Sequence, residues 1–590
     1  MSTGFPLRAY WSVVTASVVL LVYVAVLYVM PKHVFWSPDE GARFIEMQSM
    51  RWQNGLRYAL PYPAQHLDPE VHFFPGNGVY PTLGTDGTIR FPWPIWFPLL
   101  SRGPFAMFGI TGIYLVPLLS GWLVAVACGV LSHKLGSHLA PITILLVGLA
   151  SPVFFYSLTF WEHTLTTLLA LLSVLAVIHA DGRASSLLVA VPLLVMATML
   201  RLEMMAFVAA LSMALLICNR RAPSTAIKTG VSSPPRLRQR MLLFAGLGLI
   251  VALVVVWVVA LPARHLTLIT ARPFWKQQGL SQLLKFPKGL VEVVINTSRT
   301  EGPSIHLRWA AVIFGAAAVT IVAGFVRRVR LESALLLPAL FAIFVFSGFL
   351  ALSPRPYRAL HGIIPVAPYV VVACYVLPQA WRRRQRTLLL VSLLATLYLV
   401  TGVAAILVFY MDGEGLNTTL EWGQRYILTL YPLLVTLAVL AVSEYSQSVR
   451  PTKQKFAFNL LVGALIGVGI LQQVRGLRML YENRENIALW DAALRRSGLV
   501  VTDVWWLPTA VAQLYTMSDM FVFWERKELA RWLAHVRPQG VRTLTFASTR
   551  PWRDDGSWQQ ALRLLGSEAY PGGLYLHKFE VTRDESHPLP

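Results

Sequence analysis

The sequence predicts a polytopic α-helical membrane protein that ends in a small α/β domain. Of its 590 residues, 55% are hydrophobic and only 14% are charged, whereas soluble domains average about 45–50% apolar and about 25% charged residues. The mean hydropathy is +0.56. Apolar runs near the roughly 20 residues that cross a bilayer recur along most of the chain. These three observations exclude an ordinary soluble protein.

Hydropathy predicts about thirteen membrane-spanning helices. The first apolar run is too long for a signal-peptide core and lacks a small-residue cleavage site, so we expect it to be retained as an anchor. The predicted spans are 11–30, 110–131, 139–155, 164–179, 184–200, 202–218, 241–262, 310–326, 333–353, 363–378, 387–410, 426–442 and 456–474.

The apolar stretch 184–218 is interrupted only by "RLE" at residues 201–203, so one long tilted helix and two short helices both fit its length. The positive-inside rule separates the two interpretations. Two helices place the basic stretches "RRVR", "WRRRQR", "RPTKQK" and 220–240 all on the same side as the N-terminus. We therefore expect two helices joined by a tight outer turn.

The net charge of +22 is concentrated next to apolar segments. Basic loops in that position face anionic lipid on the cytoplasmic side, so the charge indicates membrane topology rather than nucleic-acid binding. The same helix parity predicts which segments lie outside. These are the first loop (31–109), the short loop near Glu162, the loops 264–308, 353–362 and 411–425, and the tail after residue 475.

Residues 475–590 are expected to form an extracytoplasmic α/β domain of roughly 100 residues, and residues 1–474 the membrane domain, with juxtamembrane helices in 31–109. Strand patterns in "LVVTDVWWLP", "MFVFW", "VRTLTFAS" and "GGLYLHKFEV" alternate with a helical pattern in "ERKELARWLAHV". The cysteines Cys128, Cys218 and Cys374 lie within apolar segments, so no disulfide framework or zinc cluster is predicted.

Two adjacent carboxylates, Asp39 and Glu40, stand in "FWSPDEGARF" just after the first apolar segment. The loop that follows is long and rich in Pro, Gly and aromatic residues, which favours a functional loop. A shielded carboxylate at the membrane surface can serve as a base. Alternatively, the pair caps a juxtamembrane helix that begins at Ser37 or Asp39, where the helix dipole favours acidic charge. Periodicity and composition alone favour the cap.

Further polar residues are expected at the outer ends of helices. "TFWEHT" contains Glu162 and His163 where a helix begins, and "LRLE" places Arg201 and Glu203 on the predicted outer turn. A glutamate at a helix start is commonly structural, and an internal ion pair explains Arg201 with Glu203. Ionisable groups near membrane depth are nevertheless costly and tend to be functional.

The entrances of later helices carry arginines. "SPRPYRALHG" contains Arg355, Arg358 and His361, and "EWGQRYILTLYP" contains Glu421 and Arg425. An arginine there can extend its charge to lipid headgroups. It can also grip a phosphate through two parallel hydrogen bonds, which lysine does less well. The residues alone leave both interpretations open.

Taken in order, these motifs resemble the GT-C-type membrane glycosyltransferases, which use polyprenyl-phosphate-linked sugars. The superfamily includes dolichyl-phosphate-mannose-protein mannosyltransferase-like and aminoarabinose transferase-like enzymes. The resemblance covers most of the predicted membrane domain and, more weakly, the tail. It is carried by "SPDEGARF", "DPEVHFFP", "IRFPWPIWFPLL", "FFYSLTFWEHTLTTLLALL", "MLRLEMMAF" and "WGQRYILTLYPLL", in the order seen in bacterial members.

The resemblance implies roles for individual residues. Asp39 would activate or orient the acceptor nucleophile, with Glu40 assisting it or holding the loop. Glu162 would be a second acidic position, and Arg425 would bind the lipid phosphate. "WEHT" departs from the Asp-containing second motif of metal-dependent oligosaccharyltransferases, so no metal ligand or cofactor is assigned. The other expected site residues are Arg355, Arg358 and His361 at the donor phosphate, and His163, Arg201 and Glu203 in support.

The implied activity is transfer of a sugar from a polyprenyl-phosphate donor to an extracytoplasmic glycan, lipid or protein acceptor, with inversion. The expected location is the bacterial inner membrane, with the active site facing the periplasm or the outside. A transporter or lipid flippase is the alternative, but transporters often show repeats and midplane sites, whereas this sequence shows no repeat and has polar candidates at outer helix ends. A non-catalytic envelope-assembly scaffold is a third interpretation, which the acidic pair and Arg425 disfavour.

Overall fold

The structure is a computed structural model of the chain, and its described part divides into two compact units. Unit 1 contains the described residues up to Tyr28 and those between 116 and 477. Unit 2 contains the described residues within Val29–Leu115 and Arg478–Pro590. The structure describes residues 4–52, 56–75, 82–83, 88–91, 94–179, 185–220, 280–295, 329–352, 362–383, 385–412, 415–416, 422–448, 453–523, 526–552 and 561–582.

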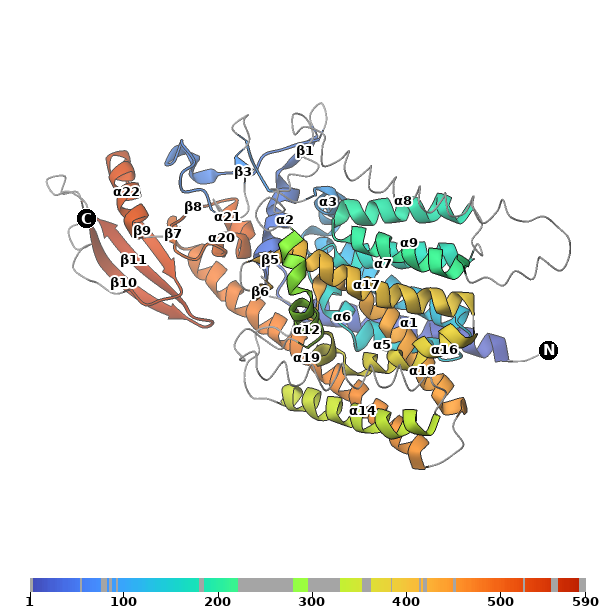
Figure 1. Cartoon of the computed structure of the whole chain (residues 1–590). Helices are drawn as coiled ribbons and strands as arrows, with labels where there is room; N and C mark the ends of the chain where they lie inside the picture. Colours follow the sequence, from blue (N-terminus) through green and yellow to red (C-terminus); the bar gives the residue numbers. More distant parts are fainter. Residues whose placement is uncertain are drawn as a thin grey trace. The chain divides into compact units, whose positions relative to one another are not determined.

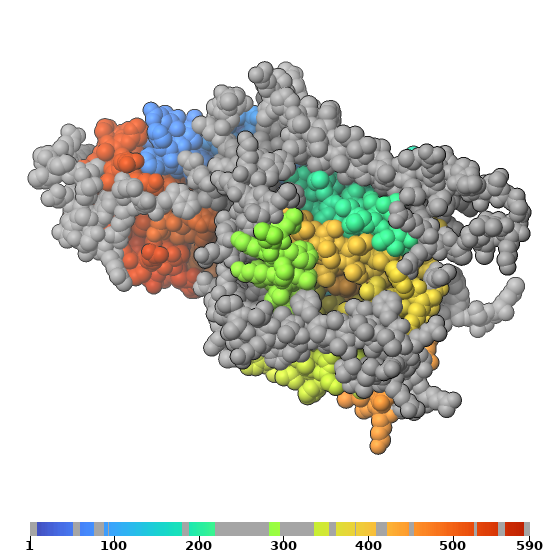
Figure 2. Space-filling model, viewed as in Figure 1, coloured from blue at the N-terminus to red at the C-terminus, as the bar shows by residue number. Residues whose placement is uncertain are grey.

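Unit 1 is helical. Helix α7 lies alongside α8, α9 alongside α17, and α17 alongside α18 (Figure 1). On the face drawn in Figure 2, α12 (green) lies against α17 (yellow). The elements of this unit are α1 (Gly4–Val29), α4 (Leu115–Lys134), α5 (Ala140–Leu149), α6 (Val153–Ser157), α7 (His163–His179), α8 (Ser185–Leu200), α9 (Met204–Arg220), η4 (Leu280–Lys285), α12 (Phe286–Ile295), α14 (Val329–Leu352), α15 (Ile363–Val366), η5 (Pro368–Tyr375), α16 (Val376–Arg383), α17 (Arg386–Tyr410), β5 (Met411–Asp412), β6 (Gly415–Leu416), η6 (Arg425–Ile427), α18 (Leu430–Ser448) and the first part of α19 (Lys453–Leu494).

Several described helices are suited to a bilayer. Helix α1 exposes large apolar side chains, including Val13, Leu21 and Tyr28, as expected where lipid rather than water surrounds a helix. Two of the predicted spans, 241–262 and 310–326, lie outside the described residues, and the total of about thirteen stays a prediction. The described part of the chain has 5 helical stretches long and apolar enough to cross a membrane: Ala9–Val29, Trp96–Lys134, Arg386–Val408, Leu430–Gln447 and Lys453–Leu494.

The predicted tight turn after residue 200 is confirmed, because α8 ends at Leu200 and α9 begins at Met204. The single helix predicted over 363–378 is wrong. The chain instead forms three short elements there, α15, η5 and α16. Pro368 explains the break: proline disfavours the helical region for the residue before it, and Ala367 has φ −140° and ψ 67°.

The described part of the first loop belongs to unit 2. Helix α2 packs against α3, and both pack within this unit. Helices α2 and α3 fall within 31–109, and their juxtamembrane position stays a prediction. The elements are α2 (Pro38–Ser49), β1 (Met50–Trp52), β2 (Leu56–Tyr58), η1 (Pro63–His66), β3 (Thr82–Leu83), β4 (Ile89–Arg90), α3 (Trp96–Phe108) and η2 (Gly109–Tyr114).

The C-terminal segment forms a 5-stranded sheet in the order β10-β11-β9-β7-β8. Strand β7 is parallel to both β8 and β9, whereas β11 is antiparallel to β9 and β10. Helix α22 lies beside this sheet in Figure 1. The four predicted strands and the predicted helix are all present. Strand β10 was not predicted, because its mostly exposed side chains lack an apolar alternation. The elements are β7 (Leu499–Thr502), α20 (Leu507–Ala510), α21 (Ala512–Tyr515), β8 (Asp519–Val522), α22 (Arg526–Val536), η7 (Arg537–Gln539), β9 (Thr543–Ser548), β10 (Leu562–Tyr570) and β11 (Leu574–Val581).

Helix α19 runs through residue 474, the predicted division between the domains, and continues to Leu494. The described parts of the first loop and of the C-terminal segment belong to the same compact unit. Direct bonds join the two segments of unit 2. The Phe35 N–H donates to the Ala510 carbonyl at 3.0 Å, and the Tyr515 hydroxyl donates to the Pro61 carbonyl at 2.7 Å.

Candidate functional site

Asp39 and Glu40 lie in the first turn of α2. Of the two residues at which the sequence allows this helix to start, the structure selects Ser37. Ser37 has an extended backbone, and its Oγ accepts from the Glu40 N–H at 3.3 Å. Pro38 follows at the first helical position, where its fixed φ suits a helix start. The capping interpretation therefore describes how this turn is built.

The two carboxylates have different surroundings. Glu40 is fully buried: its Oε2 accepts from the Trp36 N–H at 3.0 Å, and its Oε1 lies 3.3 Å from Arg484 Nη2. Asp39 is only half-buried. Glu40 is therefore bonded within the loop and to α19, and Asp39 has the more accessible carboxylate of the pair.

The motif "DPEVHFFP" forms a tight turn closed by Asp68. The Asp68 carboxylate accepts from the backbone N–H groups of His72 (3.0 Å) and Phe73 (2.8 Å) and from the Tyr62 hydroxyl (2.7 Å). Burial, with the Asp68 hydrogen bond, raises the pKa of Tyr62. The Phe73 carbonyl then accepts from the Val522 N–H of β8. This motif therefore forms a hydrogen-bonded turn that is joined to β8 within unit 2.

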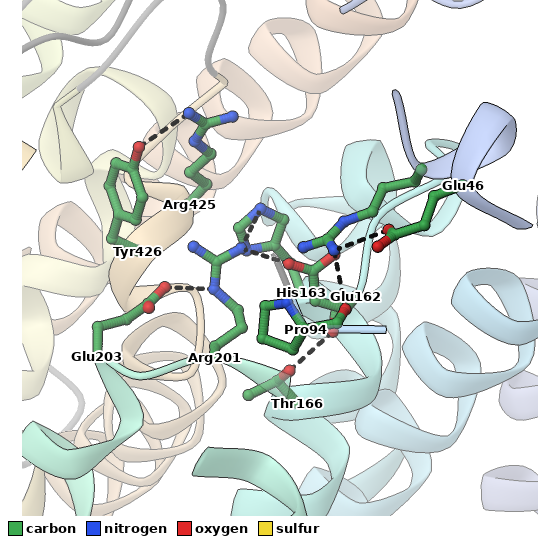
Figure 3. A network of polar contacts seen from close by, with 10 residues as sticks. Glu46, Pro94, Glu162, His163, Thr166, Arg201, Glu203, Arg425 and Tyr426 are labelled. Carbon is green, nitrogen blue, oxygen red and sulfur yellow. Dashed lines mark hydrogen bonds and ion pairs between the residues drawn. The ribbon is translucent and has the colours of Figure 1, made fainter. Parts of the chain in front are cut away.

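A polar network gathers four predicted residues in unit 1. Arg201 Nη1 lies 3.1 Å from Glu162 Oε1 and 3.1 Å from His163 Nε2, and Arg201 Nε bonds Glu203 Oε1. Figure 3 shows Arg201 between the two carboxylates. Glu162, His163 and Glu203 are all buried. The ion pair expected within "RLE" is therefore present, and Glu162 and His163 join it.

The hydrogen bond to Arg201 defines the protonation of His163. A guanidinium group only donates, so His163 Nε2 must accept and the ring carries its proton on Nδ1. The ring also packs against Tyr156 at 5.2 Å and Trp161 at 5.3 Å between centroids. His163 is consequently a neutral member of the network, and its Nε2 is occupied.

Arg425 is held by aromatic rings. Its Cζ lies 4.9 Å from the Trp161 centroid and 4.9 Å from the Tyr426 centroid, and Nη2 donates to the Tyr426 hydroxyl at 2.8 Å. The Tyr426 ring also lies 5.4 Å from Arg201 Cζ. Tyr426 therefore connects Arg425 to the acidic network. Cation–π contacts of this kind orient a guanidinium while it keeps its charge.

Three helix ends supply this cluster. Glu162 and His163 stand at the start of α7, Arg201 and Glu203 in the turn between α8 and α9, and Arg425 just before α18. The Thr166 N–H and hydroxyl both donate to the Glu162 carbonyl at 2.9 Å, which stabilises the first turn of α7. Side-chain bonding across helices is also present, since the Thr167 and Thr429 hydroxyls lie 3.1 Å apart.

The backbone segment that leads into Arg425 requires a glycine at position 423. This residue has φ +69°, a conformation that favours glycine. A Cβ there would also lie 2.5 Å from the Tyr431 hydroxyl. That hydroxyl accepts from the Gln424 N–H at 3.2 Å, and the Trp422 N–H donates to the Tyr156 hydroxyl at 3.2 Å. The "WGQRY" motif is thus anchored on both sides of the glycine.

The described predicted residues are divided between the two units. Glu162, His163, Arg201, Glu203 and Arg425 come together in unit 1, whereas Asp39 and Glu40 belong to unit 2. Within the described ranges, no three His, Cys, Asp or Glu side chains are grouped as a metal site. The predicted residues Arg355, Arg358 and His361, together with Glu421, lie outside the described residues.

Three residues that contact the candidate site residues were not predicted from the sequence. Trp161 and Tyr426 stand beside selected residues in "FWEHT" and "WGQRY", so an aromatic next to a charged candidate is the signal that was present. Arg484 gave no signal. It lies in "YENRENIALW", a run whose polarity suggests an exposed helix, yet its side chain is fully buried.

Comparisons with known proteins return solved structures only. Two are crystal structures of ArnT from Cupriavidus metallidurans, one in the apo state and one bound to undecaprenyl phosphate. The first is 12% identical, covers 98% of this chain and 99% of that chain, and has a TM-score of 0.47. The second is 12% identical, covers 97% and 99%, and has a TM-score of 0.46.

Both TM-scores lie below 0.5, so this likeness by itself assigns neither fold nor activity to the chain. No family model and no curated protein matches the sequence.

Proposed function

We propose that this chain is a membrane glycosyltransferase that moves a sugar from a polyprenyl-phosphate-linked donor to a glycan, lipid or protein acceptor outside the cytoplasm. The observation that supports it most is the Arg425 guanidinium, held by the Trp161 and Tyr426 rings next to a buried acidic network. The ends of membrane-crossing helices lie near the bilayer surface, and a lipid-anchored phosphate lies at the same depth.

Arg425 is proposed to bind the donor phosphate. The Trp161 and Tyr426 rings orient the guanidinium, and arginine is the side chain whose planar fork matches a phosphate. During transfer the phosphate is the leaving group and gains negative charge, which a held guanidinium stabilises. Arg201 is less suited to this role, because two carboxylates and an imidazole already engage it.

Asp39 is proposed to be the general base. Its half-buried carboxylate stands on the first turn of a capped helix, so its position is defined while it stays accessible. It would take the proton of the acceptor hydroxyl as the acceptor oxygen bonds to the anomeric carbon. The bond from that carbon to the phosphate oxygen breaks on the opposite face. Such a direct displacement inverts the anomeric centre.

Glu162 is proposed to act with its neighbours. Its buried contact with Arg201 makes it the acidic end of the network beside Arg425. His163, Arg201 and Glu203 then support the site by fixing that network. The donor-phosphate roles of Arg355, Arg358 and His361 stay predictions from the sequence. We place the protein in the bacterial inner membrane, with the site on the outer side, as the basic loops predict.

The direct test measures binding of undecaprenyl phosphate, the lipid product of the reaction whichever sugar is moved. Purified full-length protein is titrated with this lipid, and binding is followed by native mass spectrometry. Arg425→Lys keeps the charge but loses the two-pronged geometry, so binding should weaken about tenfold or more. The matched control is Arg383→Lys, an arginine of unit 1 whose half-exposed side chain pairs with Glu444. Equal binding by wild type and Arg425→Lys would remove Arg425 from the site.

A second test defines the reaction class in cells. Polyprenyl lipids and envelope glycans are compared by mass spectrometry in cells that carry the wild-type gene, no gene, or Asp39→Asn. A transferase predicts that lipid-phosphate sugar accumulates and that a glycan lacks one residue in the last two strains. Two results together would favour the flippase. The glycans would stay complete in cells without the gene and in cells with Asp39→Asn, and the donor lipid would stay on the inner side of the membrane only when the gene is absent.

A further inference from the structure

We infer that Arg484, on α19, is a positioning residue that holds the Asp39-bearing turn in place through Glu40. This inference rests on the proposed role of Asp39. It also gives the C-terminal segment a role at the site, because that segment provides the surface on which the first loop is fixed. Arg484, Glu40 and Asp39 all belong to unit 2.

The Arg484 side chain is completely enclosed. Both it and the Glu40 side chain have 0% exposure, and Nη2 lies 3.3 Å from Glu40 Oε1. The Tyr114 ring lies 5.0 Å from Arg484 Cζ, and Nη1 lies 3.9 Å from Met30 Sδ. A charge placed so deeply needs a partner, and Glu40 is the carboxylate that bonds it.

Glu40 transmits this constraint to the turn. Its other oxygen, Oε2, accepts from the Trp36 N–H, and its own N–H donates to Ser37 Oγ. The backbone is therefore fixed at Trp36, Ser37 and Glu40, on both sides of Asp39. The backbone that carries Asp39 is thereby held in place. Sub-ångström placement of a base matters, since a displacement of about 1 Å can cost about 10²-fold in rate.

The C-terminal segment makes a second contact with the turn that carries Asp39. Helix α2 packs directly on α20, and a Cβ at Gly41 would lie only 1.7 Å from the Thr509 carbonyl oxygen. The Phe35 N–H donates to the Ala510 carbonyl at 3.0 Å. The turn from Phe35 to Gly41 is thus held by α19 through a charge pair and by α20 through close backbone packing.

The charge also affects Lys32, which precedes this turn. Burial first, and the Arg484 charge second, lower the pKa of Lys32. The Tyr114 hydroxyl donates to the Lys32 carbonyl at 3.4 Å. The segment that leads into the turn therefore lies close to the Arg484 charge.

Apolar residues of similar volume often replace a buried ion pair without loss of stability, so stability alone does not require the pair of Glu40 and Arg484.

The test is a double-mutant cycle on the full-length protein. Turnover is measured as undecaprenyl phosphate released from a total lipid extract of host membranes, per mole of folded protein. Arg484→Lys should lower the maximal rate about 10- to 100-fold, with little change in the half-saturating amount of extract. Adding Arg484→Lys to Asp39→Asn should cause no further loss, because a positioning residue acts through the group it positions.

The control is Arg478→Lys, on the same helix. Arg478 pairs with Glu482 at 2.6 Å, but its side chain is 78% exposed. The turnover of the Arg478→Lys variant should therefore match wild type. Hydrogen exchange gives a readout that needs no turnover. The peptide covering 35–44 should exchange faster in Arg484→Lys and unchanged in Arg478→Lys. Unchanged exchange there in Arg484→Lys would overturn the inference.

A second variant covers the case in which Arg484→Lys fails to fold. Glu40→Gln with Arg484→Met removes both charges and should keep a near-wild-type melting temperature, yet it should stay slow. Wild-type rates in this double variant would show that the pair serves folding only. Additive losses with Asp39→Asn would overturn the role of Arg484 alone. Wild-type turnover in Asp39→Asn would overturn the proposed base and this inference together.

Discussion

Two buried arginines, one in each unit, meet acidic residues in different ways. Arg201 in unit 1 contacts Glu162, Glu203 and His163, which come from two helix ends, and its side chain is 12% exposed. Arg484 in unit 2 is 0% exposed and bonds Glu40. Each has a tyrosine ring near its Cζ, at 5.4 Å for Arg201 and 5.0 Å for Arg484. One arginine is the centre of a network, and the other is one half of a pair.

These two arrangements tolerate the loss of charge differently. In the unit 1 network, Arg201 keeps one carboxylate when the other is neutralised, so its burial stays compensated. In the unit 2 pair, neutralising Glu40 leaves the Arg484 cation buried beside an amide. Removal of the cation is expected to have the opposite order, because among the described residues Arg201 bonds two buried carboxylates, whereas Arg484 bonds Glu40. The largest penalty is therefore expected at Arg201 for cation loss and at Glu40 for carboxylate loss.

The largest effect is expected for Arg201→Met. It strands two buried carboxylates, and breaking even one buried pair costs about 3–5 kcal/mol. Arg201→Met should therefore destabilise the protein by more than Arg484→Met. The measurement is denaturant or thermal unfolding of purified protein in detergent. Arg383→Met, at a half-exposed pair, should cost less than about 1 kcal/mol. Equal losses for Arg201→Met and Arg484→Met would contradict the distinction between network and pair.

Neutralising the carboxylates should give the reverse order. Glu40→Gln is expected to cost about 3 kcal/mol, because a buried guanidinium loses its counter-charge. Glu203→Gln is expected to cost about 1.5 kcal/mol, the scale of a charged hydrogen bond, because Arg201 keeps Glu162. Unfolding of the two variants under the same conditions checks the order. A larger loss for Glu203→Gln would show that the network is not shared in the way the contacts indicate.

Gly41→Ala should test the packing within unit 2. Its Cβ would meet the Thr509 backbone, and overpacking of this kind typically costs about 1–3 kcal/mol. The control is Gly103→Ala in α3, where a Cβ meets nothing within 4 Å among the described residues. That change should be neutral or stabilising by up to about 1 kcal/mol, as for an unstrained helical glycine. Similar unfolding curves for both variants would contradict the close α2–α20 packing.

The smallest effect concerns His577 in β11. The Trp552 N–H donates to its Nε2 at 3.1 Å, so Nδ1 donates to Ser567 Oγ at 2.8 Å. Burial lowers the pKa of His577. The unfolded chain then binds a proton more readily, so stability is present above the ordinary pKa of about 6.5 and falls as the pH drops below it.

The measurement for His577 is the unfolding midpoint of wild type and His577→Gln between pH 7.5 and 5. The pH dependence of wild type should be steeper than that of the variant. His535→Gln, an exposed histidine on α22, serves as the control and should keep the wild-type slope. Parallel curves for wild type and His577→Gln would show that His577 takes up its proton equally in the folded and unfolded chain.

Features that depend on local pattern could be predicted from the sequence. Hydropathy identified a mostly helical membrane protein, and alternating patterns identified β7, β8, β9, β11 and α22. Loop charge identified the turn between α8 and α9. The contact within "RLE" was also predictable, and the start of α2 was narrowed to Ser37 or Asp39, because the partners stand only two and three residues apart. Each of these features is decided by neighbours along the chain.

Which distant residues meet became known only from the folded chain. Glu40 and Arg484 are 444 residues apart, and Glu162 and Arg201 are 39 apart. Hydropathy treats Arg484 as one more polar residue of a helix, since nothing in its local sequence shows which face will be enclosed. The union of the first loop with the C-terminal segment in one compact unit arises in the same way. Burial depends on packing between distant segments, and a local pattern carries no record of which segments will pack.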